Sequence, residues 1–106
     1  MSVPDIKGLL ETARRIQDEV AKVRDALGGK TVTGETGGGL VRCVANGKGE
    51  VVSLSIDPSI GGERAMIEDL TVGAVNLALE RARELAQAEL NSATGGLPLP
   101  PGLFGG

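Results

Sequence analysis

Two alternating segments joined by an Asn-Gly pair constrain the fold of this chain more than any other feature. In "GLVRCVA" one face carries Leu40, Arg42 and Val44, and the other carries Val41, Cys43 and Ala45. In "GEVVSLSID" one face carries Val52, Leu54 and Ile56, and the other carries Val51, Ser53 and Ser55. Such alternation is typical of strands with one buried face. Asn46-Gly47 between them is a strong hairpin signal because both residues tolerate positive φ, so the pattern predicts antiparallel pairing.

A third strand is predicted just before this hairpin, in "KTVTGE". Thr31, Val32 and Thr33 are β-branched and favour extended backbone. We expect Gly34 and Gly37–Gly39 to turn or bulge the chain into the next strand. Asp57-Pro58-Ser59 ends the sheet segments, since proline has no N–H to donate to a strand ladder. The middle of the chain is therefore predicted to be a three-stranded antiparallel meander.

A helix is predicted from Ser2 to Leu27, with Ser2 as its cap, Asp5 as the acid of a capping box, and Gly28-Gly29 as its end. Its apolar positions repeat in steps of 3 and 4, as a heptad does: Ile6, Leu9, Ala13, Ile16, Val20, Val23 and Leu27. This narrow stripe suits a seam with another helix. It equally suits an amphipathic helix lying on a sheet, because the run covers only about three heptads.

A second helix is predicted from Glu63 to about Ser92, about 45 Å long. Its apolar side chains point in several directions, so one sheet face cannot cover them all, and its small residues permit close approach of another helix. The sequence therefore predicts a homodimer. The candidate interface residues are Met66, Leu70, Gly73, Ala74, Leu77 and Ala78.

The order helix, three strands, helix predicts an α+β domain over residues 1–94. Residues 95–106 are rich in Gly and Pro and form a tail that cannot be helix or central strand. Two interpretations of the tail stay open. It is either a disordered end or an extended segment that docks on a protein partner through Leu97, Leu99, Leu103 and Phe104.

Composition excludes several classes of function. There is no His, so a Ser-His-Asp triad is impossible, and a zinc site is improbable with Cys43 as the one cysteine. The adjacent acids Glu68 and Asp69 complement a helix dipole rather than form a catalytic pair. We expect no enzyme activity and no cofactor. The absence of a signal peptide or a long apolar run predicts a cytoplasmic protein that does not enter the membrane.

The glycine-rich stretch "GGKTVTGETGGG", residues 28–39, looks at first like a phosphate-binding loop. A P-loop needs glycine five residues before its Gly-Lys pair, and Arg24 stands there instead. A P-loop also follows a strand and precedes a helix, whereas here a helix precedes and a strand follows. The nucleotide-binding interpretation therefore fails on both counts.

Three long stretches resemble the YbaB/EbfC family of bacterial nucleoid-associated proteins: "VTGETGGGLVRCVANGKGEVVSLSIDPSI", "MIEDLTVGAVNLALERA" and "TGGLPLPPG". The resemblance covers essentially the whole chain. It implies a dimer built from a helix, a three-stranded sheet and a long helix. It also implies binding to double-stranded DNA, with a role in nucleoid organisation or gene regulation. Many members of this family have first helices that are rich in Met and Gln and often more basic, whereas acids are interleaved in this one, "IKGLLETARRIQDEVAKVRDAL".

The net charge is −3, so DNA binding requires that the basic residues cluster. The first-helix basic residues are the preferred set. The lack of aromatics to stack on bases disfavours single-strand binding of the stacking kind. No helix-turn-helix or zinc-finger pattern is present, so contacts to the backbone are expected to outweigh base readout. The full candidate set is Lys7, Arg14, Arg15, Lys22, Lys30, Arg42 and Lys48. The alternative function is a protein-interaction accessory factor in replication, recombination or protein targeting, without strong DNA binding.

Overall fold

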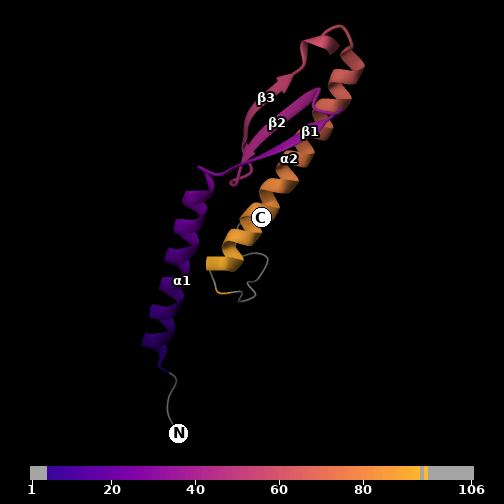
Figure 1. Ribbon diagram of the computed structural model, residues 1–106. Helices are drawn as coiled ribbons and strands as arrows, with labels where there is room; N and C mark the ends of the chain where they lie inside the picture. Colours follow the sequence, from indigo (N-terminus) through magenta and orange to yellow (C-terminus); the bar gives the residue numbers. More distant parts are fainter. Residues whose placement is uncertain (1–4, 94, 96–106) are drawn as a thin grey trace.

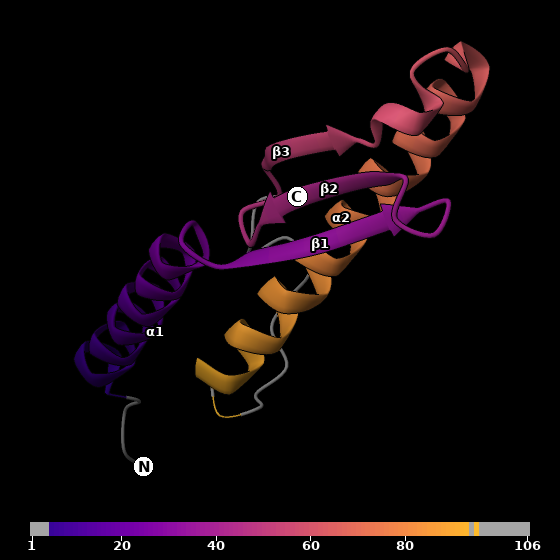
Figure 2. The same cartoon turned by 45° about the horizontal axis from the view of Figure 1, so that its top comes forward.

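The computed structural model describes residues 5–93 and 95, and its element order confirms the predicted α+β class (Figure 1). Two helices flank the strands: α1 spans Ile6–Leu27 and α2 spans Arg64–Ala93. Between them lie β1 (Thr31–Thr36), β2 (Val41–Asn46), β3 (Val51–Ile56) and the short 3-10 helix η1 (Pro58–Ile60). The sheet lies along α2, while α1 extends away from the sheet (Figures 1 and 2). The predicted tail, residues 95–106, lies outside the described residues except for Gly95.

The sheet is the predicted antiparallel meander in the order β1-β2-β3. Gly34 of β1 pairs with Cys43, and Cys43 pairs with Leu54 of β3. A bulge between Val44 and Ala45 shifts the register, so that Val51 pairs with Ala45. Because paired residues share a face, Val51 lies with Leu54 and not with Ser53, which corrects the simple alternation predicted for β3.

The hairpin turn forms where Asn46-Gly47 predicted it, but for a different physical reason. Within the described residues no residue other than glycine has positive φ, and in this turn only Gly49 does, with φ of 81°. The amide of Gly49 donates to the Asn46 carbonyl at 3.0 Å, which closes the turn. Asn46 instead organises the turn with its side chain: Oδ1 accepts from the amides of Lys48 and Glu50, at 3.0 and 3.1 Å.

The glycines of β1 and of the turn that follows it serve two different purposes. Gly37, Gly38 and Gly39 all have positive φ and make the turn, as predicted. Gly34 neither turns nor bulges the chain: it pairs regularly with Cys43 inside β1 and is buried. A Cβ atom at Gly34 would lie 2.5 Å from the carbonyl oxygen of Ala74 in α2. Gly34 is therefore required for close packing of sheet on helix.

The core is thin because small residues line both layers. Val41, Cys43 and Ala45 of β2 face Ala74, Ala78 and Ala82 of α2, and all six are fully buried. Ile60 of η1 joins this cluster at the end of the sheet. The alanines at every fourth position let the backbone of α2 lie close under β1 and β2. The face division predicted for β2 is confirmed, with Arg42 exposed on the opposite side.

The first helix begins at Ile6, and Asp5 is its N-cap rather than the acid of a capping box. The Asp5 carboxylate accepts from the amide of Gly8 at 3.1 Å, which satisfies one free amide of the first turn. Residues 1–4, including the predicted cap Ser2, lie outside the described residues. Helix α1 makes its main contacts with α2, which favours the helix seam over packing on the sheet.

The apolar stripe of α1 is covered only towards its C-terminal end. Leu27 is 3% exposed, whereas Ile6 and Leu9 are 64% and 63% exposed. Figures 1 and 2 show the reason: the N-terminal part of α1 extends past the end of α2. The first turns of α1 therefore stand free of the rest of the described chain.

Candidate nucleic-acid interface

The basic residues proposed from the sequence differ in whether an acid neutralises them. Three of the seven form ion pairs: Lys22 with Glu19 at 3.6 Å, Lys30 with Glu89 at 2.5 Å, and Arg42 with Glu35 at 3.3 Å. All three pairs are substantially exposed, so each contributes little to stability. Their charges are nevertheless partly offset, which weakens them as phosphate ligands.

The other four candidates keep their charge available. Within residues 5–93 no carboxylate oxygen lies within 4.0 Å of the side-chain nitrogens of Lys7, Arg14, Arg15 or Lys48. The first three lie on α1, and all three are exposed. Lys7 and Arg14 are seven residues apart and therefore share one face of the helix. They lie on the side of α1 that faces away from the apolar stripe, so packing of another element on the stripe leaves them accessible.

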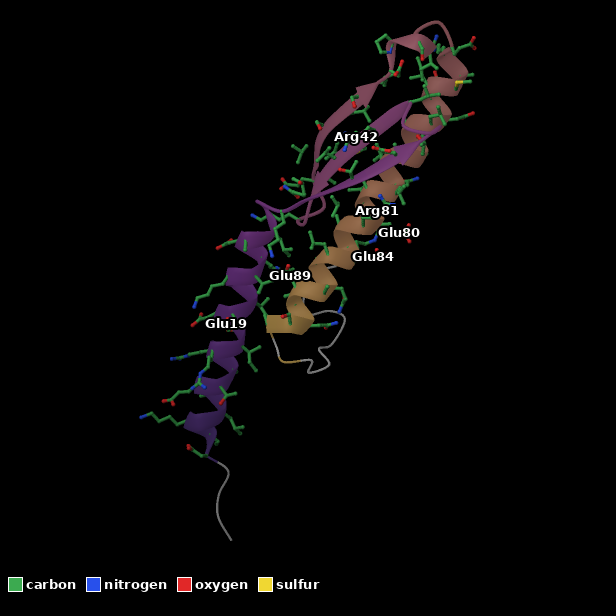
Figure 3. All side chains as sticks on the ribbon, viewed as in Figure 1. Glu19, Arg42, Glu80, Arg81, Glu84 and Glu89 are labelled. Atoms are coloured by element: carbon green, nitrogen blue, oxygen red, sulfur yellow. The ribbon has the colours of Figure 1, made fainter. Side chains whose placement is uncertain are left out.

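The sheet-side candidates do not form one surface. Lys30 and Lys48 lie near each other where α1 meets the sheet: the Gly47 amide donates to the Lys30 carbonyl, and Lys48 Cε would lie 3.1 Å from a Cβ atom at Gly28. Arg42 points from the outer face of the sheet, remote from α1 in Figure 3. The structure thus brings Lys30 and Lys48 together at the junction, leaves Lys7, Arg14 and Arg15 along α1, and places Arg42 apart from both groups.

Two further arginines of α2 have structural partners. Arg81 donates from Nη1 to the Thr33 carbonyl at 2.5 Å and so caps the free edge of β1. Arg64 pairs with Glu68 at 3.0 Å one turn along the helix. The sequence alone does not show the role of Arg81, because helical spacing says nothing about a partner on another element.

Asp57 and Cys43 have shifted pKa values. The backbone and side chain of Ser59 hydrogen-bond to Asp57 and lower the pKa of its carboxyl group. Burial raises the pKa of the Cys43 thiol. Among the described residues no three acids or thiols converge as a metal site would require, and no helix is long and apolar enough to cross a bilayer.

The predicted dimer residues lie on two different sides of α2. Ala74 and Ala78 are fully buried beneath the chain's own sheet, and Gly73 lies against the Thr36 methyl group. The Leu70 carbonyl accepts from the Thr36 hydroxyl at 2.6 Å. Met66 is 44% exposed, and Leu77 is half-buried. Intrachain packing thus accounts for most of the small residues that suggested a partner.

Besides those of α1 and Met66, large exposed apolar side chains lie on β3 and at Val72 of α2. Val51, Val52, Leu54 and Ile56 are 40% to 58% exposed, and Val72 is 62% exposed. Sequence reasoning missed this surface because the alternation of β3 predicted one buried face. The absence of charge from Val51 to Ile56 is the signal that could have found it.

Comparison with known proteins places the chain among bacterial relatives. A nucleoid-associated protein of Bradyrhizobium diazoefficiens is 42% identical over 103 residues, covering 95% of this chain and 97% of the relative. A nucleoid-associated protein of Caldanaerobacter subterraneus subsp. tengcongensis is 40% identical over 102 residues, covering 94% and 91%. Both matches span nearly the whole of each protein.

A solved structure and a family profile agree with these relatives. The crystal structure of an uncharacterised protein from Helicobacter pylori superposes with a TM-score of 0.71 at 24% identity, covering 90% of this chain and 99% of that one. This similarity supports the fold. The profile of the YbaB/EbfC DNA-binding family matches residues 1–97. The chain therefore belongs to the YbaB/EbfC DNA-binding family.

Proposed function

We propose that this protein is a homodimeric nucleoid-associated protein of the cytoplasm that binds double-stranded DNA mainly through the phosphate backbone. Family membership and the names of the relatives support DNA as the partner. The observation that carries the proposal is the set of exposed basic side chains on α1, Lys7, Arg14 and Arg15, which no acid among residues 5–93 neutralises. They lie on a helix that extends from the body of the domain and can reach a duplex (Figure 1).

Backbone contacts suit the chemistry of this surface. Lysine and arginine neutralise phosphates and release counterions, which makes binding strongly dependent on salt. The one aromatic residue of the chain, Phe104, lies outside the described residues, so the α1 surface has no ring to stack on bases. Such contacts position a protein on DNA and carry little sequence information. Lys48 extends this set at the hairpin turn, and Lys22, Lys30 and Arg42 are secondary because acids accompany them.

A salt titration with matched variants tests the surface. Arg14→Gln with Arg15→Gln should weaken DNA binding and reduce the slope of log affinity against log salt by about 0.9 for each phosphate that is no longer neutralised. Arg64→Gln with Arg83→Gln removes the same charge from α2 and should change both quantities much less. The measurement is fluorescence anisotropy with a labelled duplex. Equal weakening in the two double variants would show that net charge, and not the α1 surface, governs binding.

The second copy is expected to cover β3. Helix α2 packs mainly under β1 and β2, and it touches β3 sparsely. Leu54 and Ile56 pair with Cys43 and Val41, so they share the helix-facing side of the sheet, yet they remain 43% and 40% exposed. Val72 of α2 is 62% exposed as well. Exposed apolar side chains gathered on one strand favour an interface over solvent.

The two edge strands of the sheet differ, and this difference also favours the β3 side as the dimer interface. At the β1 edge, Arg81 donates to the Thr33 carbonyl, which blocks addition of another strand. At the β3 edge, six residues without charge or proline leave their outer backbone groups available. Two copies related by a two-fold axis can pair β3 with β3 in antiparallel fashion, giving one continuous sheet. The dimer interface we propose is therefore β3 with the Val72 flank of α2.

Two substitutions on one strand test this interface. Leu54→Lys places a charge on the apolar side and should shift the protein from dimer to monomer in analytical ultracentrifugation. Ser53→Lys introduces the same charge on the opposite face, beside Val44, and should leave the dimer intact. If Leu54→Lys remains dimeric while Met66→Lys and Leu77→Lys dissociate, the interface lies on the side of α2 that the sequence pattern indicated.

One observation favours a second candidate function, a protein-interaction accessory factor. Ile6, Leu9 and Leu10 are all more than half exposed at the free end of α1. An exposed apolar stripe on a helix is a typical docking element for another protein. Under this alternative, the uncharged substitution Leu9→Gln removes a stoichiometric protein partner from nuclease-treated lysate. Under the DNA-binding proposal, Leu9→Gln leaves duplex affinity within about twofold of wild type, because it changes no charge on α1.

A further inference from the structure

The direction of α1 is determined where its C-terminus meets the β2–β3 hairpin turn. The Gly47 amide donates to the carbonyls of both Leu27 and Lys30, at 3.0 and 2.9 Å. A Cβ atom at Gly47 would lie 2.6 Å from Leu27 Cδ2 and 2.9 Å from the Leu27 carbonyl oxygen. Leu27 itself is buried. The turn and the last residue of α1 are therefore in direct contact, and only glycine fits between them.

A second interaction links the same junction to the C-terminal part of α2. Lys30 lies between α1 and β1, and its ammonium group meets the Glu89 carboxylate at 2.5 Å across 59 residues of sequence. Glu89 lies on the part of α2 that runs beside α1, whereas Glu80 and Glu84 lie on the side away from it (Figure 3). The junction is thus held from the hairpin by Gly47 and from α2 by Glu89.

Small rotations at this junction displace the N-terminal end of α1 by several ångströms because the helix is long. A helix of 22 residues is about 33 Å long. A tilt of about 10° at its C-terminal end moves its N-terminal end by about 6 Å, nearly twice the rise of roughly 3.4 Å between successive phosphates of one strand. Lys7 and Arg14 lie towards that moving end. Their alignment with phosphates therefore depends on how firmly the junction holds α1.

We propose that Glu89 is a positioning residue for DNA binding: by holding Lys30, it fixes the direction in which α1 presents its basic face. This inference rests on the proposed function of α1. It makes a prediction opposite in sign to simple electrostatics. Removal of an acid from a DNA-binding protein raises affinity by charge alone, whereas removal of the Lys30–Glu89 pair lowers affinity by releasing α1.

The DNA-binding experiment compares two isosteric substitutions on one helix. Glu89→Gln should weaken duplex binding about threefold to fivefold at constant salt. Glu84→Gln removes the same charge about one and a half turns away and should leave affinity unchanged or raised. Unchanged or tighter binding by Glu89→Gln would overturn the proposal.

A distance measurement tests the direction of α1 without DNA. Spin labels at Asp18→Cys on α1 and Asn76→Cys on α2, in a Cys43→Ala background, report the angle between the helices by double electron–electron resonance. Labelled protein is diluted with unlabelled protein so that only distances within one chain contribute. Glu89→Gln should broaden the distance distribution, and Glu84→Gln should not. An unchanged distribution in Glu89→Gln refutes the role of Glu89, whereas failure of the wild type to bind any duplex refutes the proposed function alone.

Discussion

Gly34 of β1 lies directly against Ala78 of α2, so that a Cβ atom at Gly34 would stand 2.6 Å from the Ala78 amide nitrogen. The atoms on the other side of this contact are backbone, which cannot rotate out of the way. Gly34→Ala should therefore force the sheet away from α2 and lower the free energy of unfolding by about 2–3 kcal/mol. Chemical denaturation followed by circular dichroism measures the change.

The control for this prediction is Gly62→Ala. Gly62 has open space around its Cβ position and no positive φ, so alanine there should be tolerated. A Gly34→Ala variant as stable as Gly62→Ala would show that the sheet and α2 are not in close backbone contact.

Asn46 should be the most sensitive polar residue of the hairpin turn. It is 8% exposed, its Nδ2 donates to Glu50 at 2.9 Å, and its Oδ1 accepts from two amides. Asn46→Ala should destabilise the protein by about 1–3 kcal/mol, because two part-buried hydrogen bonds lose their acceptor. Asn76→Ala, on the exposed face of α2, is the matched control and should change stability by less than about 0.5 kcal/mol.

Asn46→Asp gives a second measurement at the same position. The carboxylate keeps an acceptor for the two amides but faces the Glu50 carboxylate, to which Asn46 had donated. Like charges at this distance repel, so the variant should recover stability as the pH falls and the acids become protonated. Thermal midpoints at pH 4 and pH 7 give the comparison, and equal destabilisation at both would contradict it.

Cys43 should be inert in the folded protein and reactive after unfolding. Its side chain is fully buried, and burial raises the pKa of its thiol, so the reactive thiolate is scarce and shielded. At pH 8 a thiol reagent such as 5,5′-dithiobis(2-nitrobenzoic acid) should label native protein slowly and denatured protein within seconds. Rapid labelling of the native protein would mean that β2 is not covered by α2.

The contribution of Asp57, at the start of η1, to the stability of the folded protein should depend on pH. Its Oδ1 accepts from the Ser59 amide at 2.8 Å, and this bond lowers the pKa of its carboxyl below the ordinary value of 3.8. A carboxyl group with a lowered native pKa stabilises the folded state above the pKa of the unfolded chain, and this contribution disappears as the pH falls through the native value. The stability difference between wild type and Asp57→Ala should therefore be present at pH 6 and shrink at pH 2.5. A difference that stays constant over this range would contradict ionised capping by Asp57.

Much of the fold could be predicted because local patterns match the local structure. The period-2 pattern of 40–45 predicted which residues of β2 are buried, and the 3-and-4 spacing predicted α1. Predictions failed where a residue serves a distant contact. Asn46-Gly47 predicted the hairpin, but Gly47 is needed against Leu27, and positive φ falls on Gly49. Gly34 looked like a turn residue and proved to be a packing residue.

The candidate site was predicted less completely. The basic residues of α1 could be chosen from spacing, since seven residues return to the same helix face. Which of the seven candidates are neutralised depends on distances across the fold. The Lys30–Glu89 pair joins residues 59 apart in sequence, and helical or strand spacing says nothing about such pairs.

By itself the sequence determined the order and type of the elements, the exposed basic face of α1 and the absence of histidine chemistry, because these depend on periodicity and composition. Only the tertiary structure decided which apolar surface stays open and which charges stay free. Helix α2 supplies Ala74, Ala78 and Ala82 to β1 and β2, and so it lies off-centre beneath the sheet. That placement leaves Leu54 and Ile56 uncovered on β3, since a single helix cannot cover three strands.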